Sequence, residues 1–200
     1  MRNKIGTTLI ILGVILVLSA TALFARNKYE ENKAADSASG VLNQLQEVIL
    51  KDEKPDETLT VTEPMDTSMP TVTVDGYHYI GYLSIPNLAL ELPVMDSWDY
   101  SKLKIAPCHY YGSYKTDDLV IAGHNYKKHF GELKNLDVGS AVYFTDAEGN
   151  IHAYKVTAIE ILLPSDTLQM VENEFDLSLY TCTYGGRERV TVRCVRQSSD

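Results

Sequence analysis

Cysteine is scarce in this chain, and its scarcity excludes one common way of stabilising a small exported domain. The sequence has three cysteines, Cys108, Cys182 and Cys194, an odd number that is too small for a disulfide framework. A Cys108–Cys194 bridge and two reduced, buried cysteines are both open interpretations. In either case one thiol, Cys182, is left over, and a free thiol in an exported protein is a candidate reactive group.

A surplus of basic residues is also absent. The formal net charge is −9, with 10 acidic against 7 basic residues before position 71 and 17 against 11 after it. The chain therefore lacks the electrostatic footprint of a nucleic-acid-binding protein. An acidic surface of this kind argues for solubility and does not by itself indicate a chemistry.

One long apolar run stands out, Ile5 to Ala25, which has 21 residues without a charge and basic residues on both sides. At about 1.5 Å per residue this run would cross a hydrocarbon core of about 30 Å. A cleaved signal peptide is the rival interpretation, although its apolar region is usually about 7–15 residues long. We expect residues 1–26 to form a cytoplasmic tip and a single-pass anchor in the cell membrane, with the rest of the chain extracellular.

Residues 27–70 are predicted to form a stalk. Apolar residues after position 40 fall on one helical face and Ser39 is a plausible cap, so a short amphipathic helix is expected here; the apolar residues are Val41, Leu42, Leu45, Val48 and Ile49. Lys51 to Pro70 is rich in Asp, Glu, Thr, Met and Pro and has no periodicity. We interpret it as a linker that holds the following domain off the membrane.

Residues 71–200 have the pattern of a domain built from short strands. Strand-like runs are 79–85, 88–94, 118–123, 141–145, 151–156 with a continuation through 163, 177–182 and 189–194. A helix is expected over Phe130–Leu136, and a helical turn near Asp166–Met170. Many short strands with so few helices predict an all-β fold, a closed or nearly closed β-barrel.

The end of the 177–182 run carries the most informative residue. Leu177, Leu179 and Thr181 alternate with Ser178, Tyr180 and Cys182, and a similar alternation follows Arg189; Gly185-Gly186 suits a tight turn between the two runs. If the two strands pair, Cys182 and Arg189 lie close together near one end of a hairpin. A cation beside a thiol favours the thiolate, which is the nucleophilic form.

A base is also needed, and five histidines are available. His124 follows the apolar run 119–123 directly, and a strand end with a glycine is a favourable place to project a side chain into a cleft. The other four have ordinary interpretations: half-exposed strand positions, a tyrosine-rich loop and a solvated position beside two lysines; they are His78, His152, His109 and His129.

Together these residues resemble the signature of the sortases, membrane-anchored cysteine transpeptidases of Gram-positive bacteria. The resemblance consists of Ala122-Gly123-His124-Asn125, then Thr181-Cys182, then Arg189 followed by a β-branched run, and it covers roughly residues 75–197. It implies an eight-stranded β-barrel with one or two short helices behind an N-terminal transmembrane helix. It also implies that His124, Cys182 and Arg189 are the catalytic residues.

The resemblance further implies the reaction and its partners. The thiolate would attack the threonine carbonyl of a sorting signal similar to Leu-Pro-x-Thr-Gly on an exported protein, and an amine from peptidoglycan or from another protein would resolve the thioacyl enzyme. Arg189 would hold the thiolate and the oxyanion, and His124 would move protons. Thr181 is a further candidate, as a donor to the oxyanion site.

The subclass stays open between class B-like and class D-like features. The tract from Trp98 to Gly112 resembles class B, but the 58 residues between His124 and Cys182 leave little room for the long helix that class B inserts there. No cofactor and no metal site is expected. Calcium is the one candidate ion, because some relatives bind it near the substrate groove; the acidic residues that would serve are Glu172, Glu174 and Asp176, and a solvated acidic loop is the alternative.

Two alternatives to the function and one question about the cationic residue remain open on the sequence. The chain could be a cysteine peptidase that only hydrolyses, or a non-enzymatic tethered β-barrel that binds wall or protein ligands. Arg187 and Arg193 also compete with Arg189 for the cationic role. Arg187 lies in the turn, and Arg193 shares a face with Arg189 but lies about 13 Å further along the strand at about 3.3 Å per residue.

Overall fold

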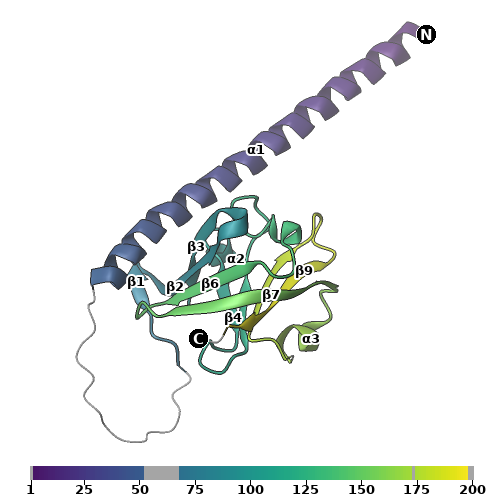
Figure 1. Cartoon of the computed structure of the whole chain (residues 1–200). Coiled ribbons are helices and arrows are strands. Elements are labelled where there is room, and N and C mark those ends of the chain that lie inside the picture. The colour runs from purple at the N-terminus through teal and green to yellow at the C-terminus, as the bar shows by residue number, and fades with distance from the viewer. Residues whose placement is uncertain (1, 52–67, 173, 198–200) are drawn as a thin grey trace, which may run out of the picture.

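One long helix and one β-barrel make up the structure (Figure 1). The computed structural model describes residues 2–51, 68–172 and 174–197. Helix α1 (Arg2–Lys51) runs without interruption for 50 residues, and its second half lies against the barrel. Most of the linker expected between Lys51 and Pro70 falls outside the described residues.

The barrel closes through eight strands in the order β2-β3-β4-β5-β8-β9-β7-β6, because β2 pairs with β6 as well as with β3. The short strand β1 adds to the end of β2. The strands are β1 (Val72–Val74), β2 (Tyr77–Ile85), β3 (Leu90–Met95), β4 (Cys108–Tyr111), β5 (Leu119–Ala122), β6 (Ala141–Asp146), β7 (Ile151–Leu162), β8 (Leu177–Cys182) and β9 (Arg189–Arg196). The predicted eight-stranded barrel is confirmed. The pairs β3–β4 and β5–β8 are parallel, and the others are antiparallel.

Short helices fill the connections between strands. They are η1 (Pro86–Leu88), α2 (Tyr100–Leu103), η2 (Leu133–Asn135) and α3 (Thr167–Val171). The helical turn predicted near Asp166–Met170 is confirmed as α3. The prediction of a helix over Phe130–Leu136 is wrong, because this segment contains only the single 3-10 turn η2. The amides of Leu133 and Leu136 donate to the carbonyls of Phe130 and Leu133 at 3.1 Å, three residues back, which is the bonding of 3-10 turns and not of a regular α-helix.

The barrel interior is filled by the alternate residues that the period of two predicts. On β8 and β9 the core positions include Leu177, Leu179, Val190 and Val192, all of them buried. The opposite positions of the same strands face outward, where α3 covers part of them through Met170. The barrel wall near β8 therefore has an apolar inner face and a partly covered outer face.

Helix α1 differs from the predicted stalk, because no separate short helix begins at Ser39. The Ser39 hydroxyl donates to the carbonyl of Ala35 within the helix, so Ser39 is an interior residue and not a cap. Ion pairs one turn apart, Arg26 with Glu30 and Lys28 with Glu31, support the helix through the polar segment after the apolar run. The helix is therefore continuous from the apolar half to the half that packs on the barrel.

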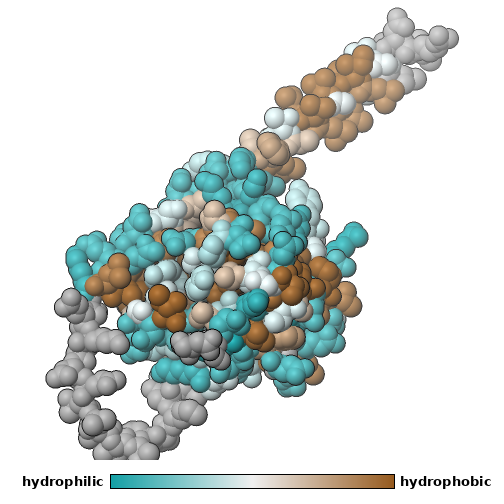
Figure 2. Space-filling model, in the orientation of Figure 1, coloured by the Kyte–Doolittle hydropathy of each residue, from teal (hydrophilic) through white to brown (hydrophobic). Residues whose placement is uncertain are grey.

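The two halves of α1 have opposite surroundings. Figure 2 shows the apolar half projecting away from the barrel. This half is long and apolar enough to span a membrane, a criterion that a signal sequence near the N-terminus also meets. The second half buries a stripe against β1 and β3 that repeats every three or four residues; it consists of Ala34, Ala35, Ala38, Val41, Leu42, Leu45 and Ile49. The stalk is thus packed onto the barrel.

The packing of α1 can be tested with two leucines of one helix. Leu45 is fully buried and Leu50 is 77 % exposed. We expect Leu45→Ala to lower the free energy of unfolding of the full chain in detergent by about 2–5 kcal/mol, because it leaves a cavity under the helix. Leu50→Ala should change it by less than about 0.5 kcal/mol. The fluorescence of Trp98, the only tryptophan, reports unfolding in denaturant; equal effects of the two substitutions would show that the helix is not docked.

Candidate functional site

The hairpin of β8 and β9 brings Cys182 and Arg189 together. They are the last register pair of the two strands, next to the turn. Thr183 and Glu188 close the turn through a backbone hydrogen bond of 2.9 Å, and Gly185 and Gly186 both adopt positive φ angles there. The predicted hairpin is confirmed, and it places the thiol and the guanidinium on directly opposed residues.

Cys182 and Arg189 also share one face of the barrel wall. Leu177 and Leu179 point into the core, so Cys182, an odd number of residues away, points outward. Its partner Arg189 points the same way, and the Cβ atoms of directly opposed residues lie about 4.5–5.5 Å apart. The two side chains are therefore neighbours at the outer rim of the barrel.

The parallel pairing of β5 with β8 brings His124 to the same corner. Ala122 pairs with Tyr180, and the amide of Gly123 donates to the Tyr180 carbonyl at 3.0 Å. His124 and Cys182 each follow that pair by two residues, on strands about 4.8 Å apart. A Cβ on Gly123 would meet the buried ring of Phe130 at 2.2 Å, so position 123 faces the core and His124 faces outward.

The imidazole of His124 lies in a partly desolvated place. Its ring stacks on Tyr126, with 3.8 Å between centroids and 16° between planes. Burial lowers its pKa below the ordinary value and Lys104 lowers it further, whereas Asn125 and Glu30 act in the opposite direction without cancelling the shift. His124 is therefore mainly neutral at pH 7, which is the form that can accept a proton.

The three cysteines are free, and they differ in environment. Cys108 and Cys194 are buried in two separate apolar clusters, and burial raises the pKa of both thiols to about 12. Cys182 is only partly buried. A thiol with so high a pKa is inert, so Cys182 is the candidate nucleophile. Of the two interpretations of Cys108 and Cys194, the structure favours the reduced, buried one.

The arginines divide into different roles. Nη1 of Arg189 donates to the carbonyls of Gly186 and Glu188 at 3.1 Å, which holds the guanidinium at the hairpin turn. Arg193 is 2 % exposed and is held by Glu160 at 3.0 Å and by Ser178 at 2.8 Å. It also donates to two carbonyls of α3. Arg193 thus fastens α3 to the barrel wall, and Arg187 is exposed in the turn.

Thr181 does not join this corner through its side chain. It is 3 % exposed and pairs with Val190, one of the core residues, so it faces the interior while Cys182 faces out. Its hydroxyl has no hydrogen-bond partner among the described residues. The structure therefore brings Cys182, Arg189 and His124 together and leaves the Thr181 hydroxyl on the other side of the wall.

A pocket of about 240 Å³ opens beside the corner, and the sequence reasoning missed it. Tyr180 and Arg189, from the two strands of the hairpin, are among its lining residues. Aromatic rings continue from there: Tyr110 lies 5.3 Å from Tyr180, and Trp98 lies 6.3 Å from Tyr110, edge to face in both cases. The remaining lining residues are Tyr100, Leu163, Pro164, Asp166, Thr167 and Met170. The cluster of aromatic residues between positions 98 and 111 was the available signal.

Of the acidic residues considered as calcium ligands, Asp176 is hydrogen-bonded to the barrel. The Asp176 carboxylate accepts a hydrogen bond from the backbone amide of Arg196 at 2.6 Å. In the described ranges, no three His, Cys, Asp or Glu side chains gather as they would around a metal ion. Calcium binding by Glu172, Glu174 and Asp176 stays an untested prediction.

The structure is a closed eight-stranded barrel with a cysteine, a histidine and an arginine at one rim. Comparison with known proteins identifies the family to which such a barrel belongs. A family model described as the sortase domain matches residues 83–197, more than half of the chain. The chain belongs to the sortase family.

Individual relatives agree with this assignment. Sortase A of Bacillus anthracis is 28% identical over 133 residues, which is 61% of this chain and 60% of the relative. The structure of sortase A from Corynebacterium diphtheriae is also 28% identical, with a TM-score of 0.57, and covers 62% of this chain. This chain spans about 60% of the length of each of these two relatives (63% for the second). A Clostridium perfringens sortase D5 transpeptidase, 17% identical with a TM-score of 0.60, covers 82% of the chain and 99% of its own, and shows the fold alone.

The titration of His124 tests the described environment. Its pKa should lie below about 6.5, the value of an unperturbed histidine, because burial penalises the charged imidazolium. Tyr126→Ala exposes the ring to water and should raise that pKa toward the unperturbed value. The shift of the imidazole Cε1 proton in NMR spectra over a pH series measures it. Tyr111→Ala, at an exposed tyrosine on β4, is the control and should leave the titration unchanged; the same result for Tyr126→Ala would contradict the stacking.

Proposed function

We propose that this chain is a cysteine transpeptidase that cleaves an LPxTG-like sorting signal and transfers the exported protein to an amine of the cell wall or of another protein. The observation that carries the proposal is the meeting of Cys182, Arg189 and His124 at one rim of a sortase barrel. Each group comes from a different strand end. A thiol, a base and a cation in one place are what acyl transfer through a cysteine requires.

In the first step the Cys182 thiol gives its proton to the neutral imidazole of His124, and the sulfur forms a bond to the threonine carbonyl carbon of the sorting signal. Arg189 stabilises the negative charge that develops on the carbonyl oxygen. The tetrahedral intermediate then breaks its C–N bond, and the leaving nitrogen takes a proton from His124. The products are a thioacyl enzyme, a free amine and a neutral imidazole.

In the second step a neutral acceptor amine attacks the thioacyl carbon. An amide bond forms while the C–S bond breaks, the acceptor nitrogen gives one proton to His124, and the sulfur leaves as a thiolate beside Arg189. Return of that proton from the imidazolium to the sulfur restores the thiol and the neutral imidazole. Hydrolysis would follow the same course with water in place of the amine.

The aromatic pocket supports the choice of an apolar peptide as the first substrate. Its walls of tyrosine, tryptophan, leucine, proline and methionine suit the side chains of a Leu-Pro segment, and its lining includes Arg189, the register partner of Cys182. The apolar half of α1 supports attachment to a membrane. In the proposed topology its N-terminus is cytoplasmic and the barrel lies outside the cell.

The reaction is tested with the full chain in detergent and a peptide that contains Leu-Pro-Glu-Thr-Gly. Mass spectrometry should detect the thioacyl enzyme and, when glycinamide is added, the ligated amide. Cys182→Ala should abolish both products with the fold intact, whereas Cys108→Ala, at a buried thiol, should retain them. Cleavage that is indifferent to the amine would instead identify a hydrolytic peptidase, and full activity of Cys182→Ala in cells would identify a binding module.

The role of Arg189 is tested against its neighbour in the turn. Arg189→Lys should lower kcat/KM by about 10²-fold or more, because a point charge does not reproduce a planar set of donors at the oxyanion. Arg187→Lys, at an exposed position, should leave kcat/KM unchanged. A wild-type rate for Arg189→Lys would remove that guanidinium from the mechanism.

A further inference from the structure

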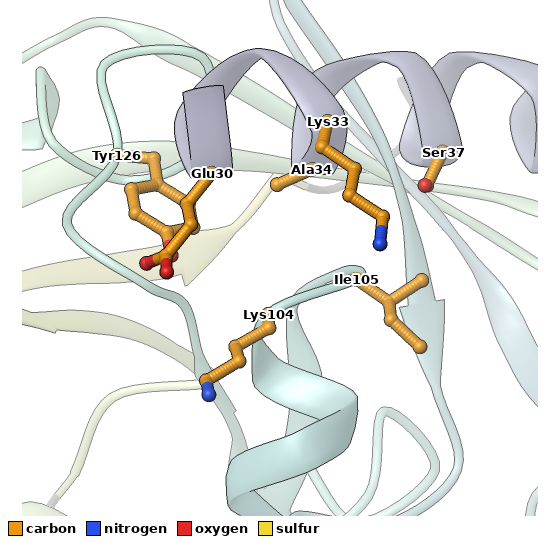
Figure 3. A pocket seen from close by; sticks show the side chains of 7 residues that line it. All are labelled: Glu30, Lys33, Ala34, Ser37, Lys104, Ile105 and Tyr126. Atoms are coloured by element: carbon orange, nitrogen blue, oxygen red, sulfur yellow. The ribbon is translucent and has the colours of Figure 1, made fainter. Parts of the chain in front are cut away.

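A second cavity lies on the helix side of the corner. It has a volume of about 280 Å³ and separates the docked part of α1 from the barrel (Figure 3). Glu30 and Lys33 reach into it from α1, and Lys104 and Ile105 approach from the loop after α2. It shares no lining residue with the aromatic pocket that ends at Arg189.

This cavity is connected to His124 through Tyr126. The Tyr126 ring lines the cavity and stacks on the imidazole of His124. Two of the three charged lining residues, Lys104 and Glu30, also lie near enough to His124 to shift its pKa, in opposite directions. His124 therefore lies beside the strand that carries Cys182, and the charged cavity lies at its stacking partner Tyr126.

The lining of the cavity carries charges of both signs. Lys33 and Lys104 are exposed and form no ion pair in the part of the chain that the structure describes, while the Glu30 carboxylate is shared with Arg26 at 3.0 Å. The apolar part of the lining consists of Ala34, Ile105 and the ring of Tyr126. Such a cavity suits a small zwitterion better than the apolar segment of a sorting signal.

We propose that this cavity binds the acceptor and selects amines that carry a carboxylate. The acceptor's carboxylate lies against the ammonium groups of Lys33 and Lys104, and Glu30 attracts the acceptor's ammonium group before it loses a proton to water. The neutral amine then advances past Tyr126 to the thioacyl carbon, and His124 takes the second proton as the amide forms and the C–S bond breaks. This inference rests on the proposed transpeptidase reaction and adds the class of its second substrate.

The experiment compares glycine with glycinamide as acceptors for the full chain in detergent, acylated by the sorting peptide. Both probes have a primary amine on the same carbon, and only glycine has a carboxylate; each probe is compared between variants, so the different basicities of the two amines do not affect the result. The double substitution Lys33→Ala/Lys104→Ala should raise KM for glycine about fivefold, the scale of two exposed charge contacts. It should leave KM for glycinamide within about twofold. Lys134→Ala, an exposed lysine outside the cavity, should change neither.

The ratio of the two acceptors separates binding from an altered histidine. Loss of Lys104 also changes the charge near His124, but that change affects the rate with both acceptors equally. Equal responses of glycine and glycinamide to the double substitution would overturn the inference, while thioacyl formation and hydrolysis would still support the transpeptidase. Absence of a thioacyl enzyme in the wild-type chain would overturn the proposed function and this inference together.

Discussion

The parallel pairing of β5 with β8 is the constraint on which the site depends. It sets Ala122 opposite Tyr180, and His124 and Cys182 lie two residues beyond that pair although 58 residues separate them in the chain. A slip of one residue would turn one of the two side chains to the interior, because successive residues of a strand face opposite sides. The buried ring of Phe130 against Gly123 works against such a slip, since that position has no room for a side chain.

Strand β9, the antiparallel partner of β8, adds Arg189 to the site. The buried guanidinium of Arg193, on the outer face of the same strand, supports the barrel wall there. Arg193 bonds to Ser178, to Glu160 and to two carbonyls of α3, so the desolvation of its charge is offset by several hydrogen bonds. Because α3 supplies Thr167 and Met170 to the aromatic pocket, Arg193 also helps to fix one wall of that pocket. Two of the three arginines on β9 thus have different surroundings: Arg189 lies at the corner with Cys182, and Arg193 fastens α3 to the barrel wall.

Local pattern predicted seven of the eight barrel strands and the corner, whereas β4 was interpreted as a tyrosine-rich loop. The period of two on β8 and β9 predicted that Cys182 and Arg189 would meet, and the glycine at a strand end marked His124 among five histidines. The same alternation already placed Thr181 on the opposite face from Cys182, so its suggested role conflicted with the pattern itself. The burial of Arg193 was not predictable in this way, because its partner Glu160 lies 33 residues away and on another strand.

The helical structure of residues 27–33, which follow the apolar run, was hard to predict for a similar reason. Residues 27–33 have no apolar stripe of their own, and the helix there is supported by ion pairs and by contacts with the barrel, such as the Lys127 amide donating to Glu31 at 3.1 Å. The aromatic pocket also depends on contacts between distant segments, since Tyr110 meets Tyr180 across 70 residues. Both features come from tertiary packing, which a local period does not encode.

The continuity of α1 limits how far from the membrane the barrel can lie. The apolar run ends at Ala25, and Glu30 already lines the cavity beside the corner, a rise of only about 8 Å along the helix. With α1 spanning the bilayer in the proposed topology, the corner that holds Cys182 would be kept near the lipid headgroups, because the helix that crosses the membrane is itself packed on the barrel. Scissile bonds that emerge close to the bilayer would be processed, and those presented far above it would stay out of range.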